Sequence, residues 1–229
     1  SMSFKAVIFD LDGTLLNTLE DIADAANIVL RRMGYPLHEY EQYKYLVGEG
    51  MDVLMRRALP SDVSDDTLVS ECVSAMRKEY GARWHVKTQP YPGVPELLDE
   101  LTVLGIALAV LSNKPDDFTK TMVADLLPAR HFAIVQGATA SAPKKPDPTT
   151  ALEIARLLTL AEQEILFVGD SAIDMQTGLR AGMYPAGVLW GFRDAEELIA
   201  SGAQVLIKEP AELLKLLDET IQDSKYSRE

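Results

Sequence analysis

Hydrophobic residues follow two different patterns along the chain, and the change between them divides the sequence. Residues 5–9 form an apolar run without polar alternation, which is typical of a strand covered on both faces, as in a parallel sheet. Residues 18–80 instead carry apolar positions at helical spacing, as from Leu19 through Ile22 to Leu30. After residue 90, helical stretches alternate with short apolar runs, which predicts β-α-β units and a parallel sheet.

The two patterns predict different sets of elements on either side of residue 90. The first part should hold four helices and no strand after the initial one, at residues 18–33, 39–45, 51–59 and 65–80, with Gly81 ending the last helix. The second part should begin with a helix opened by Pro95 and closed by Gly105. Further strands are expected at residues 106–111, 131–136, 164–168, 184–189 and 203–207.

This arrangement predicts an α/β fold with a doubly wound parallel sheet. The first strand belongs to a sheet whose other strands arrive only after residue 90, so the helical segment is an insertion in the loop that follows that strand. We therefore expect a Rossmann-like catalytic core of residues 1–16 and 86–229. We expect a helical cap of residues 17–85, placed to cover the end of the first strand.

Composition limits the partners that the protein can have. A hydrophobic content of 47% with 25% charged residues in 229 residues is that of a soluble globular protein. The 22 Lys and Arg against 35 Asp and Glu give a net charge of −13, so we expect neither nucleic acid nor a membrane surface as partner. A single cysteine, Cys72, excludes an internal disulfide, and no apolar run is long enough to span a membrane, so a cytoplasmic location is expected. The sequence does not distinguish a monomer from a homodimer.

Polar residues follow four of the predicted strands. Each cluster alone has a structural interpretation, because Asp-Gly is a common turn dipeptide and serine and lysine often cap helices or face solvent. The carboxyl ends of parallel strands, however, meet at one edge of a sheet, where ligands bind in such folds. Four clusters at the same edge favour a reaction site. They consist of Asp10 and Asp12 with Gly13 and Thr14; Ser112, Asn113 and Lys114; Lys144 and Lys145; and Asp170 with Asp174.

The chemistry of these residues points to phosphoryl transfer. The four aspartates would repel one another unless a cation neutralised them, and all-oxygen ligation indicates Mg²⁺. One free aspartate can attack phosphorus, and a second carboxylate two residues on can protonate the leaving oxygen and later activate water. Ser112 and Lys145 would then hold the phosphoryl oxygens. The acidic surface requires such a local source of positive charge for any phosphorylated substrate.

The four clusters, in this order, resemble the motifs of the haloacid dehalogenase superfamily of phosphatases. The resemblance implies that Asp10 is the nucleophile and Asp12 the general acid and base. It also implies that Ser112, Asn113 and a lysine bind the phosphate. Lys144 and Lys145 are both candidates for that lysine, and we favour Lys145 because it directly precedes Pro146. Mg²⁺ would be held by the Asp10 carboxylate, the Asp12 main-chain carbonyl and Asp170, with Asp174 acting through water.

Three shorter motifs resemble the phosphoglycolate phosphatase branch of that superfamily. They are residues 47–50, which contain Gly48, Glu49 and Gly50, residues 91–94, and residues 112–115. The resemblance implies hydrolysis of a small phosphorylated metabolite, 2-phosphoglycolate or one similar to it. Residues 48–50 form either a plain turn between helices or a substrate-specificity loop that enters the site when the cap closes. Glu49 would then disfavour a substrate carboxylate, whose cationic partner the sequence does not identify.

Other functions remain open at this point. A phosphomutase of the β-phosphoglucomutase type also forms an aspartyl phosphate, and dependence on a sugar bisphosphate would indicate it. A phospho-accepting signalling module also carries an aspartate on a parallel sheet, but Asp12 is placed to hydrolyse its phosphate quickly. The dehalogenase branch lacks the second aspartate that Asp12 supplies.

Overall fold

A six-stranded parallel sheet forms the centre of the molecule. The computed structural model describes residues 3–127 and 131–217. The strand order is β5-β4-β1-β6-β7-β8, so the first strand lies inside the sheet between strands that come much later in the chain. The predicted doubly wound α/β fold is confirmed. The strands are β1 (Ala6–Phe9), β4 (Ala107–Pro115), β5 (Phe132–Ala138), β6 (Ile165–Gly169), β7 (Tyr184–Val188) and β8 (Val205–Ile207).

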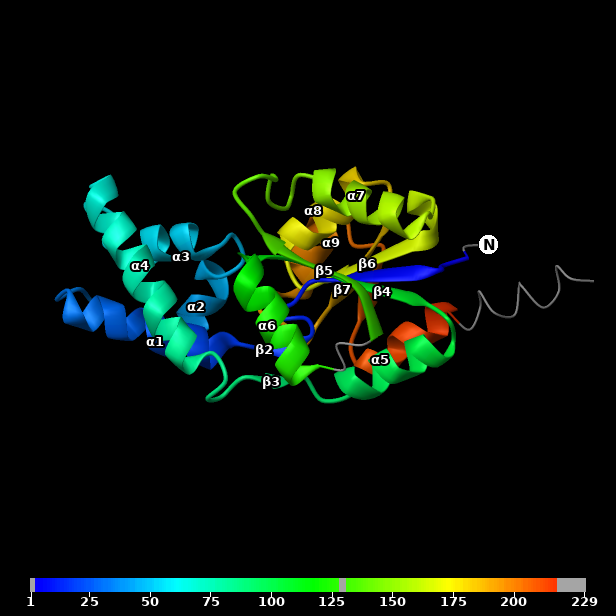
Figure 1. Cartoon of the computed structure of the whole chain (residues 1–229), viewed down its shortest axis with the longest axis horizontal. Helices are drawn as coiled ribbons and strands as arrows, with labels where there is room; N and C mark the ends of the chain where they lie inside the picture. The colour runs from blue at the N-terminus through cyan, green and yellow to red at the C-terminus, as the bar shows by residue number, and fades with distance from the viewer. Residues whose placement is uncertain (1–2, 128–130, 218–229) are drawn as a thin grey trace, which may run out of the picture.

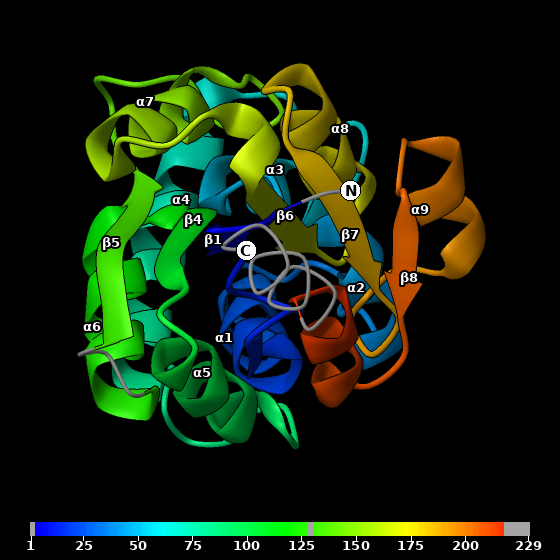
Figure 2. The same ribbon diagram turned by 90° about the vertical axis from the view of Figure 1, so that its right-hand side faces the viewer.

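Both faces of the sheet are covered, as the uninterrupted apolar run of β1 predicted. Successive side chains of a strand point to opposite faces. Val7 and Phe9 therefore pack in one apolar cluster with α5 (Val94–Val103) and α6 (Asp116–Leu126), while Ala6 and Ile8 pack in another with α7 (Thr149–Leu158). Figures 1 and 2 show these helices on opposite sides of the sheet, with α8 (Ala172–Arg180) beside α7 and α9 (Ala195–Ala200) toward the β8 edge.

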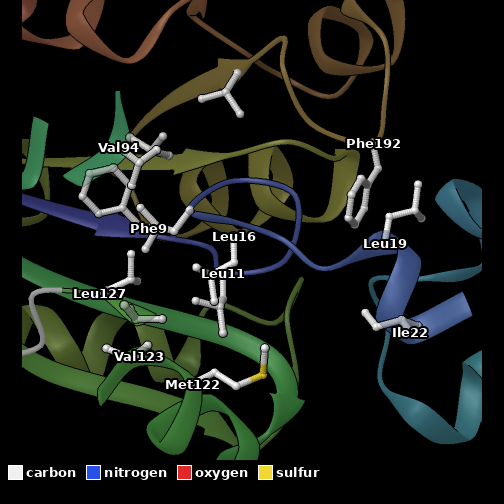
Figure 3. Packing of buried hydrophobic residues seen from close by; sticks show 14 of the residues in the cluster. Phe9, Leu11, Leu16, Leu19, Ile22, Val94, Met122, Val123, Leu127 and Phe192 are labelled. Atoms are coloured by element: carbon white, nitrogen blue, oxygen red, sulfur yellow. The ribbon is translucent and has the colours of Figure 1, made fainter. Parts of the chain in front are cut away.

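Four helices lie together beyond the carboxyl ends of the strands (Figure 1). They are α1 (Leu19–Arg32), α2 (Tyr40–Leu46), α3 (Met51–Ala58) and α4 (Asp66–Arg83), which confirms the four helices expected in this segment. Apolar side chains continue without a break from the sheet into α1, and Figure 3 shows this path from Phe9 and Leu11 to Leu19 and Ile22. Among the residues that the structure describes, no helix is long and apolar enough to cross a bilayer.

Two expectations about the helical segment are wrong in detail. A short antiparallel pair, β2 (Leu16–Asn17) with β3 (Gln89–Pro90), joins the points where the chain leaves and re-enters the core, although no strand was expected there. Two residues are too few to show an alternating pattern. Helix α4 also passes through Gly81 and ends at Arg83. A glycine inside a helix costs only about 1 kcal/mol relative to alanine, which packing of the helix can outweigh.

Strand β4 is longer than the run of residues 106–111 predicted. It continues to Pro115, so Ser112, Asn113 and Lys114 belong to the end of the strand rather than to a loop after it. The pairing of β4 with β5 shifts register between Leu111 and Pro115. Irregular pairing of this kind re-aims side chains, and here the affected residues face the candidate site.

Candidate active site

Three aspartates from two strand ends converge at one point. Asp10 directly follows β1, Asp170 directly follows β6, and Asp174 lies in the first turn of α8. One carboxylate oxygen from each lies within 4.8 Å of those of the other two, and this is the single group of potential metal ligands among the described residues. The predicted convergence of these residues is therefore present. Asp12 contributes no carboxylate oxygen to this group.

Lys145 is bonded into this aspartate cluster through all three of its N–H groups. Its Nζ donates to Asp10 Oδ1 at 2.9 Å, to Asp174 Oδ1 at 2.8 Å and to the Leu111 carbonyl at 2.8 Å. The neighbouring Lys144 points elsewhere, with its Nζ 3.2 Å from the main-chain oxygen of Glu49. The structure thus places Lys145, not Lys144, among the catalytic candidates.

Asn113 fixes the position of the Lys145 backbone. The Lys145 N–H donates to Asn113 Oδ1 at 2.9 Å, and Asn113 Nδ2 donates to the Lys145 carbonyl at 3.0 Å. The same Nδ2 also lies 3.1 Å from the Gly48 carbonyl. Both polar atoms of this side chain, which we expected to contact phosphate, are engaged by protein groups. Ser112 is buried and lines the cavity, and its Oγ accepts a hydrogen bond from the Lys114 N–H at 3.0 Å.

Asp170 is held in one orientation by two donors. Thr14 Oγ1 donates to its Oδ1 at 3.1 Å, and the Phe192 N–H donates to its Oδ2 at 3.0 Å. Gly13 lies directly against it with a φ of +83°, and a Cβ at that position would be 2.2 Å from Asp170 Oδ2. Only glycine fits there, because any side chain would be strained and would also displace the carboxylate.

The aspartate cluster is short of positive charge. Burial, followed by the nearby charge of Asp174, raises the pKa of Asp170 to about 7. The same two causes raise the pKa of Asp10 well above its usual range, against the opposing effect of Lys145. A bound divalent cation would remove this electrostatic cost, and a set of hard carboxylate oxygens suits Mg²⁺. The residues present therefore fit the predicted metal.

Asp12 lies beside the cluster with a cation of its own. Lys114 Nζ donates to Asp12 Oδ1 at 2.9 Å, and the two side chains are only 4% and 12% exposed. The same Nζ lies 4.4 Å from the centre of the Tyr80 ring in α4. In the sequence, Lys114 stood out only as a neighbour of Ser112. These two residues are two positions apart, which puts their side chains on the same face of a strand, and this spacing was the available signal.

A small cavity of about 50 Å³ separates these residues from the helical segment. Its lining includes Gly48 and Gly50 of the predicted specificity loop but not Glu49. The core contributes Asp10, Asp12, Ser112, Asn113, Lys114, Pro115, Lys145, Asp170, Ser171, Asp174, Phe192 and Arg193, and the segment between β2 and β3 contributes Ile22, Lys44, Val47, Gly48, Gly50, Met51, Leu54, Met76 and Tyr80.

Glu49 is turned away from the cavity and already has a cationic partner. Its carboxylate pairs with Arg57, and its side chain is 34% exposed. The loop instead meets the core through its main chain, since the Gly48 and Glu49 carbonyls accept hydrogen bonds from Asn113 and Lys144. The repulsion between Glu49 and a substrate carboxylate, which the sequence predicted, is therefore absent from this arrangement.

Comparison with known proteins identifies the family. Residues 7–188 match the family model for haloacid dehalogenase-like hydrolases, and this range includes all four polar clusters. The chain belongs to this family. The family predicted from the motifs is thereby confirmed, and the sheet edge described above is the part of this hydrolase that carries them.

Several relatives are similar over nearly their whole length. A phosphoglycolate phosphatase of Vibrio parahaemolyticus serotype O3:K6 is 33% identical over 218 residues, covering 93% of this chain and 96% of its own. One from Aquifex aeolicus is 33% identical over 217 residues, covering 95% and 98%. The crystal structure of a predicted phosphoglycolate phosphatase from Haemophilus somnus superposes with a TM-score of 0.87 at 27% identity, covering 93% and 97%. The predicted enzyme class, a phosphatase, is confirmed.

Proposed function

We propose that this phosphatase is a Mg²⁺-dependent phosphomonoesterase that acts on a small phosphorylated metabolite, 2-phosphoglycolate or one closely similar, through an aspartyl phosphate on Asp10. One observation carries the proposal: Asp10 lies in a buried cluster with Lys145, Asp170 and Asp174, while Asp12 lines the same cavity outside that cluster. The two aspartates of one motif thus have different surroundings and can have different roles.

Asp10 is the nucleophile in this proposal. A carboxylate oxygen of Asp10 attacks phosphorus, and the bond between phosphorus and the leaving oxygen breaks as the new P–O bond forms. Lys145, 2.9 Å from Asp10, and the hydroxyl of Ser112 stabilise the negative charge that develops on the phosphoryl oxygens. Asp12 gives its proton to the leaving oxygen, which departs as an alcohol.

Water completes the reaction in the second step. Asp12, now a carboxylate, removes a proton from a water molecule that attacks phosphorus from the side vacated by the alcohol. The bond between Asp10 and phosphorus breaks, inorganic phosphate is formed, and both aspartates return to their starting states. Lys114, whose Nζ donates to Asp12 Oδ1 at 2.9 Å, orients this carboxyl group at the cavity.

Asp10 and Asp170 are the residues whose carboxylates would hold Mg²⁺, together with the main-chain carbonyl of Asp12, with Asp174 acting through water. Bound there, the ion would supply positive charge both to the aspartates and to the phosphoryl group. Thr14 and the Phe192 N–H orient Asp170 for this task, because they occupy one lone pair on each of its oxygens.

Residues 17–85 act as a cap in this proposal, over a core of residues 1–16 and 86–229. Hydrogen bonds from Asn113, Lys144 and Arg193 to the carbonyls of Gly48, Glu49 and Lys44 support this assignment, because core side chains bind the main chain of the helical segment at the cavity. A closed cap excludes water from the first step and so protects the aspartyl phosphate until the alcohol has left.

The assignment of substrate rests on the relatives. The Vibrio and Aquifex relatives are named phosphoglycolate phosphatases and match this chain over more than nine-tenths of its length.

The test is a kinetic comparison of the purified protein with its Asp10→Asn variant on 2-phosphoglycolate and on a panel of phosphorylated metabolites. We expect hydrolysis of 2-phosphoglycolate with the highest kcat/KM, loss of activity on chelation, recovery with Mg²⁺, and no turnover by the variant. Normal hydrolysis by Asp10→Asn would overturn the assignment of the nucleophile. Activity that requires a sugar bisphosphate would identify a mutase, and an acyl phosphate lasting for hours would identify a signalling module.

A further inference from the structure

Two buried lysines face the cavity, and their surroundings differ. Lys145 and Lys114 have side chains that are 3% and 4% exposed, so both ammonium groups are removed from bulk solvent. Lys145 uses its three N–H groups on Asp10, Asp174 and the Leu111 carbonyl. Lys114 donates to Asp12 alone among the protein groups in the described part of the chain, and its other near neighbour is the face of the Tyr80 ring.

A buried ammonium group with two N–H groups left over is costly unless water or a ligand accepts from them. One carboxylate already faces Lys114, so a further acceptor must come from the cavity that this residue lines. Because the group is a cation in a low-dielectric setting, an anionic oxygen would be favoured over a neutral one.

The position of Lys114 relative to the reaction identifies where on the substrate this anion would be. Asp12 gives its proton to the leaving oxygen in the proposed mechanism, and Lys114 Nζ is 2.9 Å from that aspartate. Lys114 is therefore next to the leaving group and not to the phosphoryl group. In 2-phosphoglycolate a single methylene separates the ester oxygen from a carboxylate, so the carboxylate can reach Lys114 while the ester oxygen contacts Asp12.

The rest of the cavity offers few alternatives for binding that end of a substrate. Its cap wall is mainly apolar, with Ile22, Met51, Leu54 and Met76, and these residues provide no partners for the hydroxyl groups of a sugar. Two other cations line the cavity, but neither pairs with a proposed catalytic residue as Lys114 does, since Lys44 pairs with Glu41 at 3.1 Å and the Arg193 guanidinium pairs with Glu197 at 2.7 Å.

We propose that Lys114 is the residue that determines substrate class, by binding a carboxylate attached to the carbon next to the phosphate ester. The preferred substrates are then short 2-phosphooxy carboxylates. This inference rests on the proposed function, because it places the leaving group beside Asp12. It supplies the cationic partner that the sequence alone did not identify.

The test compares 2-phosphoglycolate with ethyl phosphate, in which a methyl group replaces the carboxylate. Both substrates are assayed with the wild-type protein and with Lys114→Met in the presence of Mg²⁺. Loss of Lys114 also disturbs Asp12 and lowers turnover of both substrates, so the informative quantity is the ratio of their kcat/KM values. We expect this ratio to fall roughly 100-fold in the variant, the effect of removing one partner of a buried ion pair. An unchanged ratio would overturn the inference.

Lys144→Met is the matched control. Lys144 belongs to the catalytic core and lies at the same end of the sheet, but its Nζ donates to the Glu49 carbonyl, away from the reacting groups. Its replacement should therefore leave the ratio of the two kcat/KM values unchanged. An equal fall of the ratio in both variants would contradict a specific role for Lys114.

The wild-type protein alone gives a second test that does not depend on the folding of a variant. We expect it to prefer 2-phosphoglycolate over ethyl phosphate by roughly 100-fold in kcat/KM. Equal rates on the two substrates would overturn the inference about Lys114 but leave the proposed phosphatase intact. Failure to hydrolyse any phosphomonoester would instead overturn the proposed function, and this inference with it.

Discussion

The two walls of the cavity are built from opposite kinds of residues. On the core side, Asp10, Asp170, Asp174 and Lys145 gather at the carboxyl edge of the sheet, and hydrogen bonds join them to one another or to neighbouring donors. On the cap side, the wall is largely apolar, with Met51, Leu54 and Met76 among its residues. Only a rigid, fully bonded arrangement can hold reacting groups to the precision that catalysis needs. The apolar wall can move away and return without leaving buried charges unpaired.

The bonds between the two walls fit this division. Asn113, Lys144 and Arg193 of the core donate to main-chain carbonyls of residues 44–49, and the side chains of those residues are not required for these bonds. In the proposed function the cap opens, and such bonds can then be exchanged for bonds to water. In that proposal, the core wall therefore governs the reaction and, through Lys114, the selection of substrate, while the cap wall governs access.

Removing the central cation of the core wall should have the largest effect. In Lys145→Met, Asp10 and Asp174 lose the ammonium group that bonds both of them. We expect kcat to fall at least about 1000-fold, because both the nucleophile and the developing charge lose their partner. Without Mg²⁺ the free energy of unfolding should fall by about 3 kcal/mol, as for other broken buried pairs, measured by urea titration. Turnover within tenfold of the wild type would contradict the comparison of the two walls.

Metal binding should depend on the same wall. We expect Mg²⁺ to raise the melting temperature of the wild type, with a gain of about 2.7 kcal/mol in stability at a concentration 100 times the Kd. Asp170→Asn keeps the shape of the side chain and its bond from Thr14 but removes one charged ligand. This variant should lose most of the Mg²⁺-induced shift and fall roughly 100-fold in activity at a fixed metal concentration. An identical thermal shift in both proteins would exclude Asp170 as a ligand.

Replacement of Asn113, whose side chain joins the two walls, should have an effect of intermediate size. Asn113 bonds both backbone polar groups of Lys145 and the Gly48 carbonyl, so Asn113→Ala leaves buried polar groups without partners. We expect a loss of about 1–3 kcal/mol in stability and a fall in kcat/KM of roughly tenfold. Asn113→Asp is the matched variant, because it keeps the acceptor for the Lys145 N–H but loses both donations. An effect on stability alone, with normal kcat/KM, would show that Asn113 does not position Lys145 for the reaction.

Much of the core wall could be predicted from the sequence, because its residues follow directly from strand patterns. Asp10 and Asp170 come immediately after apolar runs that can only be buried strands, and parallel strands bring their ends together. The bond between Lys114 and Asp12 could not be predicted in the same way, since it joins residues 102 positions apart through an irregular end of β4. Likewise the sequence placed Glu49 in the loop but not the direction of its carboxylate, which a pairing with Arg57 in α3 determines.

Replacement of Glu49 should have the smallest effect, and it tests most directly whether the cap wall places an acidic side chain against the substrate. Its carboxylate pairs with Arg57 at a partly exposed position and does not line the cavity. In Glu49→Gln we therefore expect a change in stability of less than about 1 kcal/mol, as for other solvent-screened pairs. The kcat/KM for 2-phosphoglycolate should change less than about threefold, while its ratio to the value for ethyl phosphate stays the same. If Glu49 instead faced the substrate, removing its charge would raise the preference for the carboxylate-bearing compound. An increase of that ratio by tenfold would show that the loop turns its acidic side chain inward during turnover, and the cap wall would then contribute a negative charge as well as apolar surface.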